Sequence, residues 1–396
     1  MTNNVAQSLA DRLLAQRAKR GMETLGGQTS VPLAGLINVG SGTPSFPTPE
    51  HIVEAAQKAL TDGYTAYTPW LGYLDLREAI ADKLIRDINL QVDPETEIMV
   101  TAGAQEALSV IFHAIFEEGD EVVLPDPYYN EYVRWASNSG AKLVGVPTTQ
   151  EEDFVVDPEK IASAITPRTK MIALTTPNNP TGTVLPRNVL ERIAAIAIER
   201  DLIVLSDELY EQFIYGDYQH FSISSLPGMK ERTIVVNGFS KTYAMTGFRV
   251  GYIAAPAPFI SAMLPIKHSF SICASAISQR AALAALTGPQ AWWTDVLAGC
   301  AERRDQWLRG LDEMGLTYGM PMGSYVFLIN TSSTGLAGSE FARALVAEEK
   351  VRIGGGDGYG QGAKNHVRAS LMVGEGDLEE ALTRMGRIAQ RIREQS

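Results

Sequence analysis

The chain has 396 residues, of which 45% are hydrophobic and 20% charged, as in a globular protein too long for one small core. Its net charge of −12 and pI near 5.0 argue against nucleic acid or an anionic membrane as the main partner. The two cysteines form no C-x-x-C pair, the five histidines have no metal-ligand spacing, and no segment resembles a signal peptide or membrane span. We therefore expect a cytoplasmic protein without a metal site.

Short apolar segments bounded by turn residues recur through the middle of the chain. Most are apolar throughout, which is typical of strands buried on both faces of a largely parallel sheet. They lie at 98–101, 121–124, 142–146, 171–175, 202–206, 233–236 and 250–254. Helical patterns between them, such as 104–116 and 188–199, predict an α/β domain with about seven strands over residues 51–275.

The C-terminal part of the chain has a different pattern. Amphipathic helices are predicted at 275–286, 290–314, 339–349 and 377–393. Two strand candidates, 325–329 and 366–371, interrupt them. We expect a smaller α+β domain that combines residues 276–396 with residues 1–50.

Lys241 and Arg249 lie close together in a segment that has few other charges. Desolvation can neutralise such a lysine, and a neutral amine is a nucleophile towards aldehydes. The planar fork of an arginine suits a phosphate dianion. An aldehyde and a phosphate on one small molecule describe pyridoxal phosphate (PLP). The alternative is a solvated Ser-Lys turn beside a structural arginine.

Three consecutive predicted strands end at polar residues that this cofactor needs. Asn179, Asp207 and Lys241 each follow one of these strands, so they should meet at one edge of the sheet. A buried Asp207 would keep the pyridine nitrogen protonated, while Asn179 and Tyr210 would hold the phenolic oxygen. Taken alone, Asp207 is equally consistent with a helix N-cap or a surface acid.

A phosphate site is predicted where the strand 98–101 passes into the helix 104–116. Ala104 and Gln105 would present free N–H groups at the positive end of the helix dipole. Most glycines at such junctions, like Gly103, merely make the turn. Tyr129 is a candidate for stacking on the cofactor ring, and packing in the core is the equal alternative.

Together these motifs resemble the class I and II aminotransferases of PLP fold type I, the aspartate aminotransferase superfamily. The motifs that carry the resemblance are Asn-Asn-Pro-Thr-Gly at 178–182, Asp-Glu-Leu-Tyr at 207–210, and Ser-Lys followed by Gly and Arg at 240–249. The resemblance runs from about Asn38 to the C-terminus. It implies a homodimer that moves an amino group between an L-amino acid and a 2-oxo acid.

The resemblance also implies roles for individual residues. Lys241 resembles the Schiff-base lysine that also moves protons, Asp207 the partner of the pyridine nitrogen, and Tyr210 and Asn179 the donors to the ring oxygen. Further residues would bind the phosphate, namely Ala104, Gln105, Ser240, Arg249 and, from the neighbouring subunit, Tyr67. Arg368 resembles the arginine that grips the substrate α-carboxylate, and Gly42 the glycine beside it, although a lone strand arginine is usually a surface ion-pair residue.

The chain departs from relatives at several positions. Gln105 replaces a lysine found in some dicarboxylate-selective relatives, and Gly238 replaces a serine that many relatives use for the phosphate. The glycine-rich loop 354–362 is either a mobile cover near the substrate or a plain flexible loop. Trp70 and Tyr67 are candidates for bordering the substrate pocket.

Two other functions remain open from the sequence. A PLP-dependent β-lyase acting on sulfur amino acids shares the same cofactor residues. An aminotransferase-like regulator is the alternative from another class, but such regulators carry an N-terminal DNA-binding domain, and only about 40 residues precede the first motif.

Overall fold

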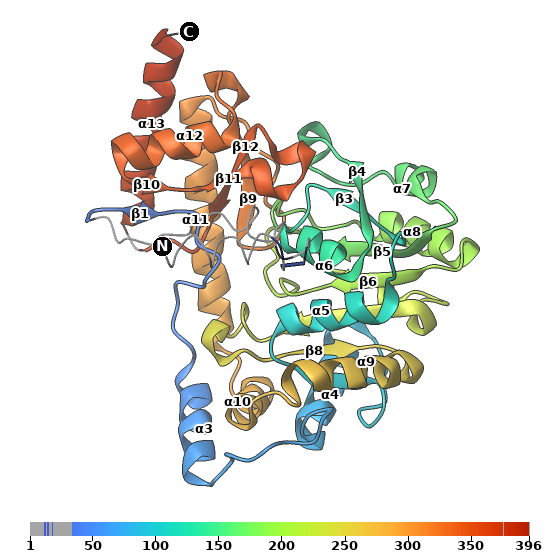
Figure 1. Ribbon diagram of the computed structural model, residues 1–396. Helices are drawn as coiled ribbons and strands as arrows, with labels where there is room; N and C mark the ends of the chain where they lie inside the picture. The colour runs from blue at the N-terminus through green and yellow to red at the C-terminus, as the bar shows by residue number, and fades with distance from the viewer. Residues whose placement is uncertain (1–11, 13, 16–17, 19–33, 375, 396) are drawn as a thin grey trace.

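The structure is a computed structural model that describes residues 12, 14, 15, 18, 34–374 and 376–395. Its largest part is a seven-stranded sheet (Figure 1). Across the sheet the strands are β2 (Ile98–Thr101), β8 (Gly251–Ala254), β7 (Thr233–Gly238), β6 (Ile203–Asp207), β5 (Thr169–Thr175), β3 (Glu121–Asp126) and β4 (Lys142–Pro147). Strand β8 runs antiparallel to both of its neighbours, and the other neighbouring pairs are parallel. The prediction of a mostly parallel seven-stranded sheet is confirmed.

Helices cover both faces of this sheet, because alternate strand residues point to opposite sides. Met99 packs in the apolar cluster of one face, whereas its neighbours Ile98 and Val100 pack in that of the other. The first face is covered by α5 (Ala104–Ile115), α6 (Glu131–Ser139) and α9 (Ala257–Ser271). The second is covered by α4 (Leu74–Ile88), α7 (Pro158–Ala164), α8 (Arg187–Glu199) and α10 (Ala276–Thr287), with α3 (Glu50–Thr61) against α4 and α10.

A second core lies around the C-terminal strands. The antiparallel sheet there has the order β11 (Gly354–Gly355), β12 (His366–Ser370) and β9 (Val326–Asn330). It packs with α11 (Trp292–Met314), α12 (Gly338–Ala344) and α13 (Asp377–Gln395). The predicted helix 339–349 is not uniform, because α12 passes into a π-helical turn, η6 (Leu345–Glu349).

The described part of the N-terminal segment joins this second core. Strand β1 (Ile37–Asn38) pairs in parallel with β10 (Val351–Arg352), as Figure 1 shows. Tyr210, Phe213 and Tyr215 from the large sheet's side also pack into the second core. The division into 51–275 and 1–50 with 276–396 stays a prediction, and most of residues 1–33 lie outside the described residues.

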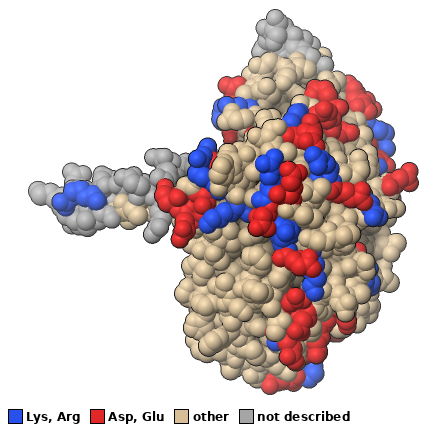
Figure 2. Space-filling model, turned by 90° about the vertical axis from the view of Figure 1, so that its right-hand side faces the viewer, with Lys and Arg blue, Asp and Glu red and all other residues tan. Residues whose placement is uncertain are grey.

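Short helical turns complete the described chain. They are η1 (Gln150–Glu152), η2 (Ile223–Ser225), η3 (Lys230–Arg232), η4 (Thr246–Phe248), η5 (Ser332–Thr334), η7 (Gly356–Tyr359) and η8 (Gln361–Ala363). No helix among the described residues is long and apolar enough to cross a membrane. Figure 2 shows that acidic and basic side chains are intermixed on one face of the molecule, with no separate basic patch there.

Candidate active site

A cavity of about 400 Å³ lies beyond the carboxyl ends of β5, β6 and β7. All the site residues expected from the sequence line it except Tyr67 and Trp70, namely Gly42, Ala104, Gln105, Tyr129, Asn179, Asp207, Tyr210, Ser240, Lys241, Arg249 and Arg368. Their convergence follows from the sheet, because the ends of adjacent parallel strands share one edge. We call Asn179, Asp207, Tyr210 and Lys241 the strand-end wall.

Lys241 follows β7 in a turn that is anchored by its neighbours. Phe239 and Met245 are buried in the core, and the Met245 amide donates to the Phe239 carbonyl. The Lys241 Nζ donates to the Gly42 carbonyl over 2.8 Å. Burial is the main cause that lowers the pKa of Lys241 to about 8, and the nearby charges of Arg368 and Arg249 contribute to this shift. A useful fraction of the amine is therefore neutral near pH 7 to 8.

Asp207 is the last residue of β6 and is buried. The strand begins and ends one residue later than the sequence predicted, because Asp207 pairs with Thr175 on one side and Val236 on the other. Among the described residues, its carboxylate accepts only long hydrogen bonds, from Tyr132 Oη and the Leu209 amide, both at 3.4 Å. Burial raises its pKa to about 7. A carboxyl group in this state is poised to ionise when a cation arrives beside it.

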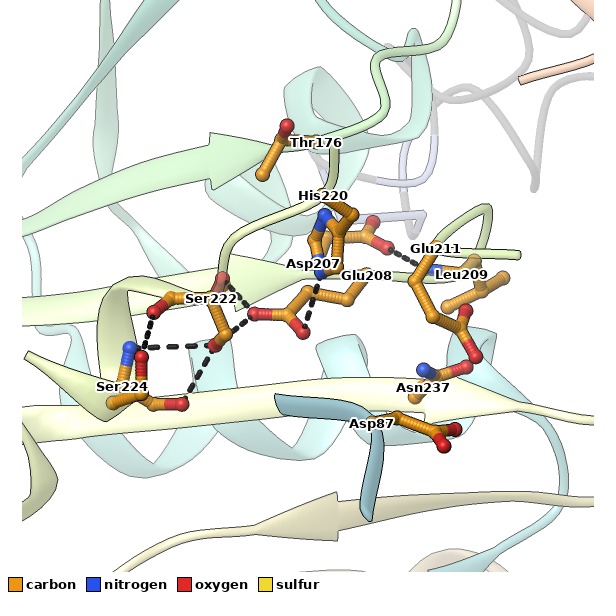
Figure 3. A network of polar contacts seen from close by, with 12 residues as sticks. Asp87, Thr176, Asp207, Glu208, Leu209, Glu211, His220, Ser222, Ser224 and Asn237 are labelled. Carbon is orange, nitrogen blue, oxygen red and sulfur yellow. Dashed lines mark hydrogen bonds and ion pairs between the residues drawn. The ribbon is translucent and has the colours of Figure 1, made fainter. Parts of the chain in front are cut away.

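Glu208 lies beside Asp207 in a separate, well-bonded polar network (Figure 3). Its carboxylate accepts from Ser206 Oγ at 2.6 Å, Ser222 Oγ at 2.5 Å and His220 Nε2 at 3.2 Å. These donors keep the pKa of Glu208 below its usual value although burial opposes them. The other ring nitrogen, His220 Nδ1, is buried and has no partner within the part of the chain that the structure describes. Glu208 thus adds a fixed negative charge behind Asp207.

The start of α5 and Arg249 form an anion-binding geometry at one end of the cavity. Gly103 precedes the helix with φ of +80°, and a Cβ there would lie 2.8 Å from Arg249 Nη2. The guanidinium therefore packs directly over the helix N-terminus, whose free N–H groups carry a partial positive charge. Ser240 also lines the cavity. Gly238 has Gly251 Cα 3.2 Å from the place of a Cβ, so a serine would be tight there.

Arg368 forms the other end of the cavity. Its Nη2 donates to the Gly40 carbonyl at 2.9 Å and its Nη1 to Asn179 Oδ1 at 3.3 Å. The Tyr359 ring lies 5.2 Å from its Cζ. We call Arg368, Gly40 and Tyr359 the arginine corner. Arg368 Nε is buried and has no partner in the described ranges of the chain, so this guanidinium still has donor capacity for an anion.

Sequence reasoning missed several residues of this site. Tyr325 Oη donates to the same Gly42 carbonyl as Lys241, at 2.6 Å, and its ring lies 5.7 Å from the lysine Nζ. Its only signal was a place at the start of a predicted strand. Tyr132 bonds Asp207, and Trp135 lines the cavity, but both looked like ordinary apolar positions of a helix.

Tyr67 lies outside the cavity wall and is 79% exposed. Trp70, at 55%, is also exposed, and its ring lies 4.7 Å from that of His268 on α9. Within one chain neither side chain borders the cavity that holds Lys241. Gln105 Nε2 donates to Tyr129 Oη at 3.3 Å, which ties the α5 residue to the candidate stacking residue.

The family described as aminotransferase class I and II matches residues 34–385 of this sequence. The chain belongs to the class I and II aminotransferases. Its resemblance to this family and its fold type I architecture are confirmed. The protein is an enzyme, a transaminase.

Relatives of this aminotransferase carry different substrate names. An aspartate aminotransferase of Pyrococcus abyssi is 41% identical over 355 residues, which cover 89% of this chain and 91% of the relative. Aromatic-amino-acid aminotransferase 2 of Thermococcus litoralis is 38% identical over 358 residues, with 90% and 92% covered.

The similar solved structures likewise include both aromatic and aspartate aminotransferases. An aromatic aminotransferase from Pyrococcus horikoshii has a TM-score of 0.88 and 39% identity, covering 91% of this chain and 97% of its own. A Thermus thermophilus aspartate aminotransferase with maleate has a TM-score of 0.88 and 37% identity, covering 95% and 100%.

Proposed function

We propose that this aminotransferase holds pyridoxal phosphate in the cavity and moves an amino group between an L-amino acid and a 2-oxo acid. One observation carries the proposal. Within one cavity, the Lys241 amine has a pKa lowered to about 8, and the buried Asp207 carboxyl has a pKa raised to about 7. The first is a nucleophile for an aldehyde, and the second suits a ring nitrogen that must carry a positive charge.

The residues present fit this cofactor. The N-terminus of α5, Arg249 and Ser240 would hold the phosphate, and Asn179 with Tyr210 would hold the ring oxygen. Tyr129 would lie against the ring. When bound, pyridoxal phosphate supplies an electron sink that stabilises the negative charge left by removal of the substrate α-proton.

The chain's own groups would do the rest of the work. The neutral Lys241 Nζ would take the α-proton and return it, because its pKa lies near working pH. Arg368, with Gly42 beside it, would bind and orient the substrate α-carboxylate, so that the α-proton faces the lysine. The enclosing Tyr210, Tyr325 and Trp135 side chains would exclude water from the lysine amine.

The substrate side chain is neutral or acidic among the named relatives, which include aspartate and aromatic aminotransferases. The cationic residues lining the cavity within the described chain are Lys241, Arg249 and Arg368, and each already has a proposed task. A panel of amino donors, each tested in a single half-reaction, decides which substrate side chain the enzyme prefers. When no 2-oxo acid acceptor is added, we expect each active site to form one molecule of 2-oxo acid from the donor.

The same panel separates the β-lyase alternative. A lyase acting on a sulfur amino acid would release pyruvate catalytically without any 2-oxo acid acceptor, whereas the transaminase would stop after one turnover. Continued pyruvate release would overturn the proposed function.

A homodimer and a cytoplasmic location complete the proposal. The exposed Tyr67 and Trp70 support a partner subunit that covers them, and Tyr67 would then reach the phosphate of the partner's site. Both cysteines are free thiols, which suits a reducing compartment.

Hybrid dimers test the shared site. Lys241→Ala and Tyr67→Ala subunits each give inactive or weak homodimers, but a hybrid of the two has one intact site if the tyrosine acts across the interface. We expect about half of wild-type activity from the purified hybrid. A hybrid no more active than the Tyr67→Ala homodimer would show that Tyr67 acts within its own subunit.

A further inference from the structure

The glycine-rich loop 356–363, made of η7 and η8, is attached to the end of β3 by one carboxylate. Asp126 is buried at the end of that strand, and its Oδ2 and Oδ1 accept the amides of Gln361 and Gly362, both at 3.0 Å. Among the described residues Asp126 has no ion-pair partner. The two loop amides are therefore its main compensation for burial.

The loop is shaped to receive this carboxylate. Gly360 has φ of +101°, and a Cβ at that position would overlap with Asp126 Oδ1. The Asp126 carbonyl is itself held by the Thr148 amide and hydroxyl, at 3.0 and 2.8 Å. The Tyr128 amide also donates to the Tyr359 carbonyl at 3.0 Å, close to the two bonds between Asp126 and the loop amides. Asp126 thus binds a segment that lies more than two hundred positions away in the sequence.

The loop held by Asp126 places Tyr359 against Arg368. The ring lies 5.2 Å from the guanidinium carbon, on the residue that would bind the substrate carboxylate. The loop also begins next to β11, where Gly354 pairs with Arg368.

We propose that Asp126 is a positioning residue for substrate recognition: its carboxylate fixes the loop 356–363, and the fixed loop holds Tyr359 against Arg368. The inference rests on the proposed role of Arg368. It makes Tyr359 a residue that sets how firmly the guanidinium is oriented towards a carboxylate. Neither residue belongs to the strand-end wall, so cofactor binding should not depend on them.

Asp126→Asn is the main test, because the amide keeps the shape but turns an N–H donor towards one loop amide. We expect the KM of every amino donor to rise about tenfold, with kcat and the PLP dissociation constant changed less than twofold. Asp153→Asn is the matched control, since the Asp153 carboxylate also accepts a distant main-chain amide, that of Met320 at 3.0 Å, but makes no hydrogen bond to the loop or to Arg368 among the described residues. Its KM should stay within twofold of wild type.

Two variants of Tyr359 distinguish a loss of Arg368 positioning from a general folding defect. Tyr359→Phe keeps the ring and should behave like wild type, whereas Tyr359→Leu should raise KM about as much as Asp126→Asn. The double variant Asp126→Asn/Tyr359→Leu should be no worse than Tyr359→Leu alone, because both changes disturb the same contact. An unchanged KM in Asp126→Asn or in Tyr359→Leu, multiplied effects in the double variant, or a parallel loss of PLP affinity would overturn the proposal.

Amide hydrogen exchange tests the hydrogen bonds between Asp126 and the loop without an activity measurement. Peptides containing Gln361 and Gly362 should exchange faster in Asp126→Asn than in wild type or Asp153→Asn. Unchanged exchange would show that Asp126 does not fix the loop. A wild-type protein that transaminates no amino acid would instead refute the proposed function, while the exchange result would still decide whether Asp126 holds the loop.

Discussion

Arg368 of the arginine corner lines the same cavity as the strand-end wall, but the chain builds the wall and the corner in different ways. The wall gathers Asn179, Asp207, Tyr210 and Lys241 from three neighbouring strand ends of one sheet. The corner gathers Gly40, Tyr359 and Arg368 from segments far apart in the chain, through a carbonyl contact, a ring contact and the loop at Asp126.

The two sides also differ in their electrostatics. Burial shifts the pKa of Lys241 down to about 8 and that of Asp207 up to about 7, so both wall residues can change their charge near neutral pH. The corner holds a permanent cation oriented by neutral groups. The difference suggests that the wall performs the chemistry and that the corner performs recognition. Each prediction below tests that separation.

The largest effect is expected from the wall. Lys241→Ala would remove the residue that we propose as both the covalent partner of the cofactor and the proton carrier, so transamination should fall by more than about a thousandfold. The visible or near-ultraviolet absorbance band of the lysine-bound cofactor should disappear. Lys267→Met is the control, because Lys267 is fully buried in α9 but lies outside the cavity. Loss of the band in the control, or its survival in Lys241→Ala, would contradict the assignment.

A change in the corner should spare the cofactor. Arg368→Met removes a charge-assisted carboxylate contact of about 3 kcal/mol, so KM should rise about a hundredfold for every amino donor. The PLP dissociation constant, measured by fluorescence titration of the apo-protein, should stay near that of wild type. An effect confined to one class of amino donor side chain would show that Arg368 does not bind the α-carboxylate.

A smaller effect is expected where the wall meets α5. Gly103→Ala would push a methyl group to 2.8 Å from Arg249 Nη2 and should weaken PLP binding about tenfold, with little change in KM. Gly63→Ala controls for backbone strain, since Gly63 has a similar φ of +84° but nothing within 4 Å of its Cβ position. Equal losses of PLP affinity in the two variants would mean that strain, and not the guanidinium, causes the effect.

The smallest predicted change concerns the charge behind Asp207. Burial is the main cause of the raised pKa of Asp207, and Glu208 adds to it. Glu208→Gln should therefore lower the titration midpoint of Asp207 in the apo-protein by less than about one pH unit, so that more of it is ionised at pH 7. Difference infrared spectra of the protonated carboxyl group measure this. Ser224→Ala, which keeps the Glu208 charge, should leave the midpoint in place.

The same contrast explains what could be predicted from the sequence. The wall was predictable because strand periodicity places Asn179, Asp207 and Lys241 at one edge, whatever the rest of the chain does. The motif resemblance added Arg368, but not what surrounds it. Tyr325, Asp126 and Tyr359 were missed, because their contacts come from tertiary packing between distant segments. The loop 354–362 was read only as flexible or mobile, since nothing local indicates that a buried carboxylate accepts its amides.

The most direct test of the account is to find the lysine that carries the cofactor. Borohydride treatment of the PLP-loaded enzyme makes the cofactor–lysine bond permanent, and mass spectrometry of the digested protein locates it. The account predicts one added pyridoxyl phosphate group per chain, on Lys241. An adduct on another lysine such as Lys83 or Lys267, or no adduct at all, would contradict it.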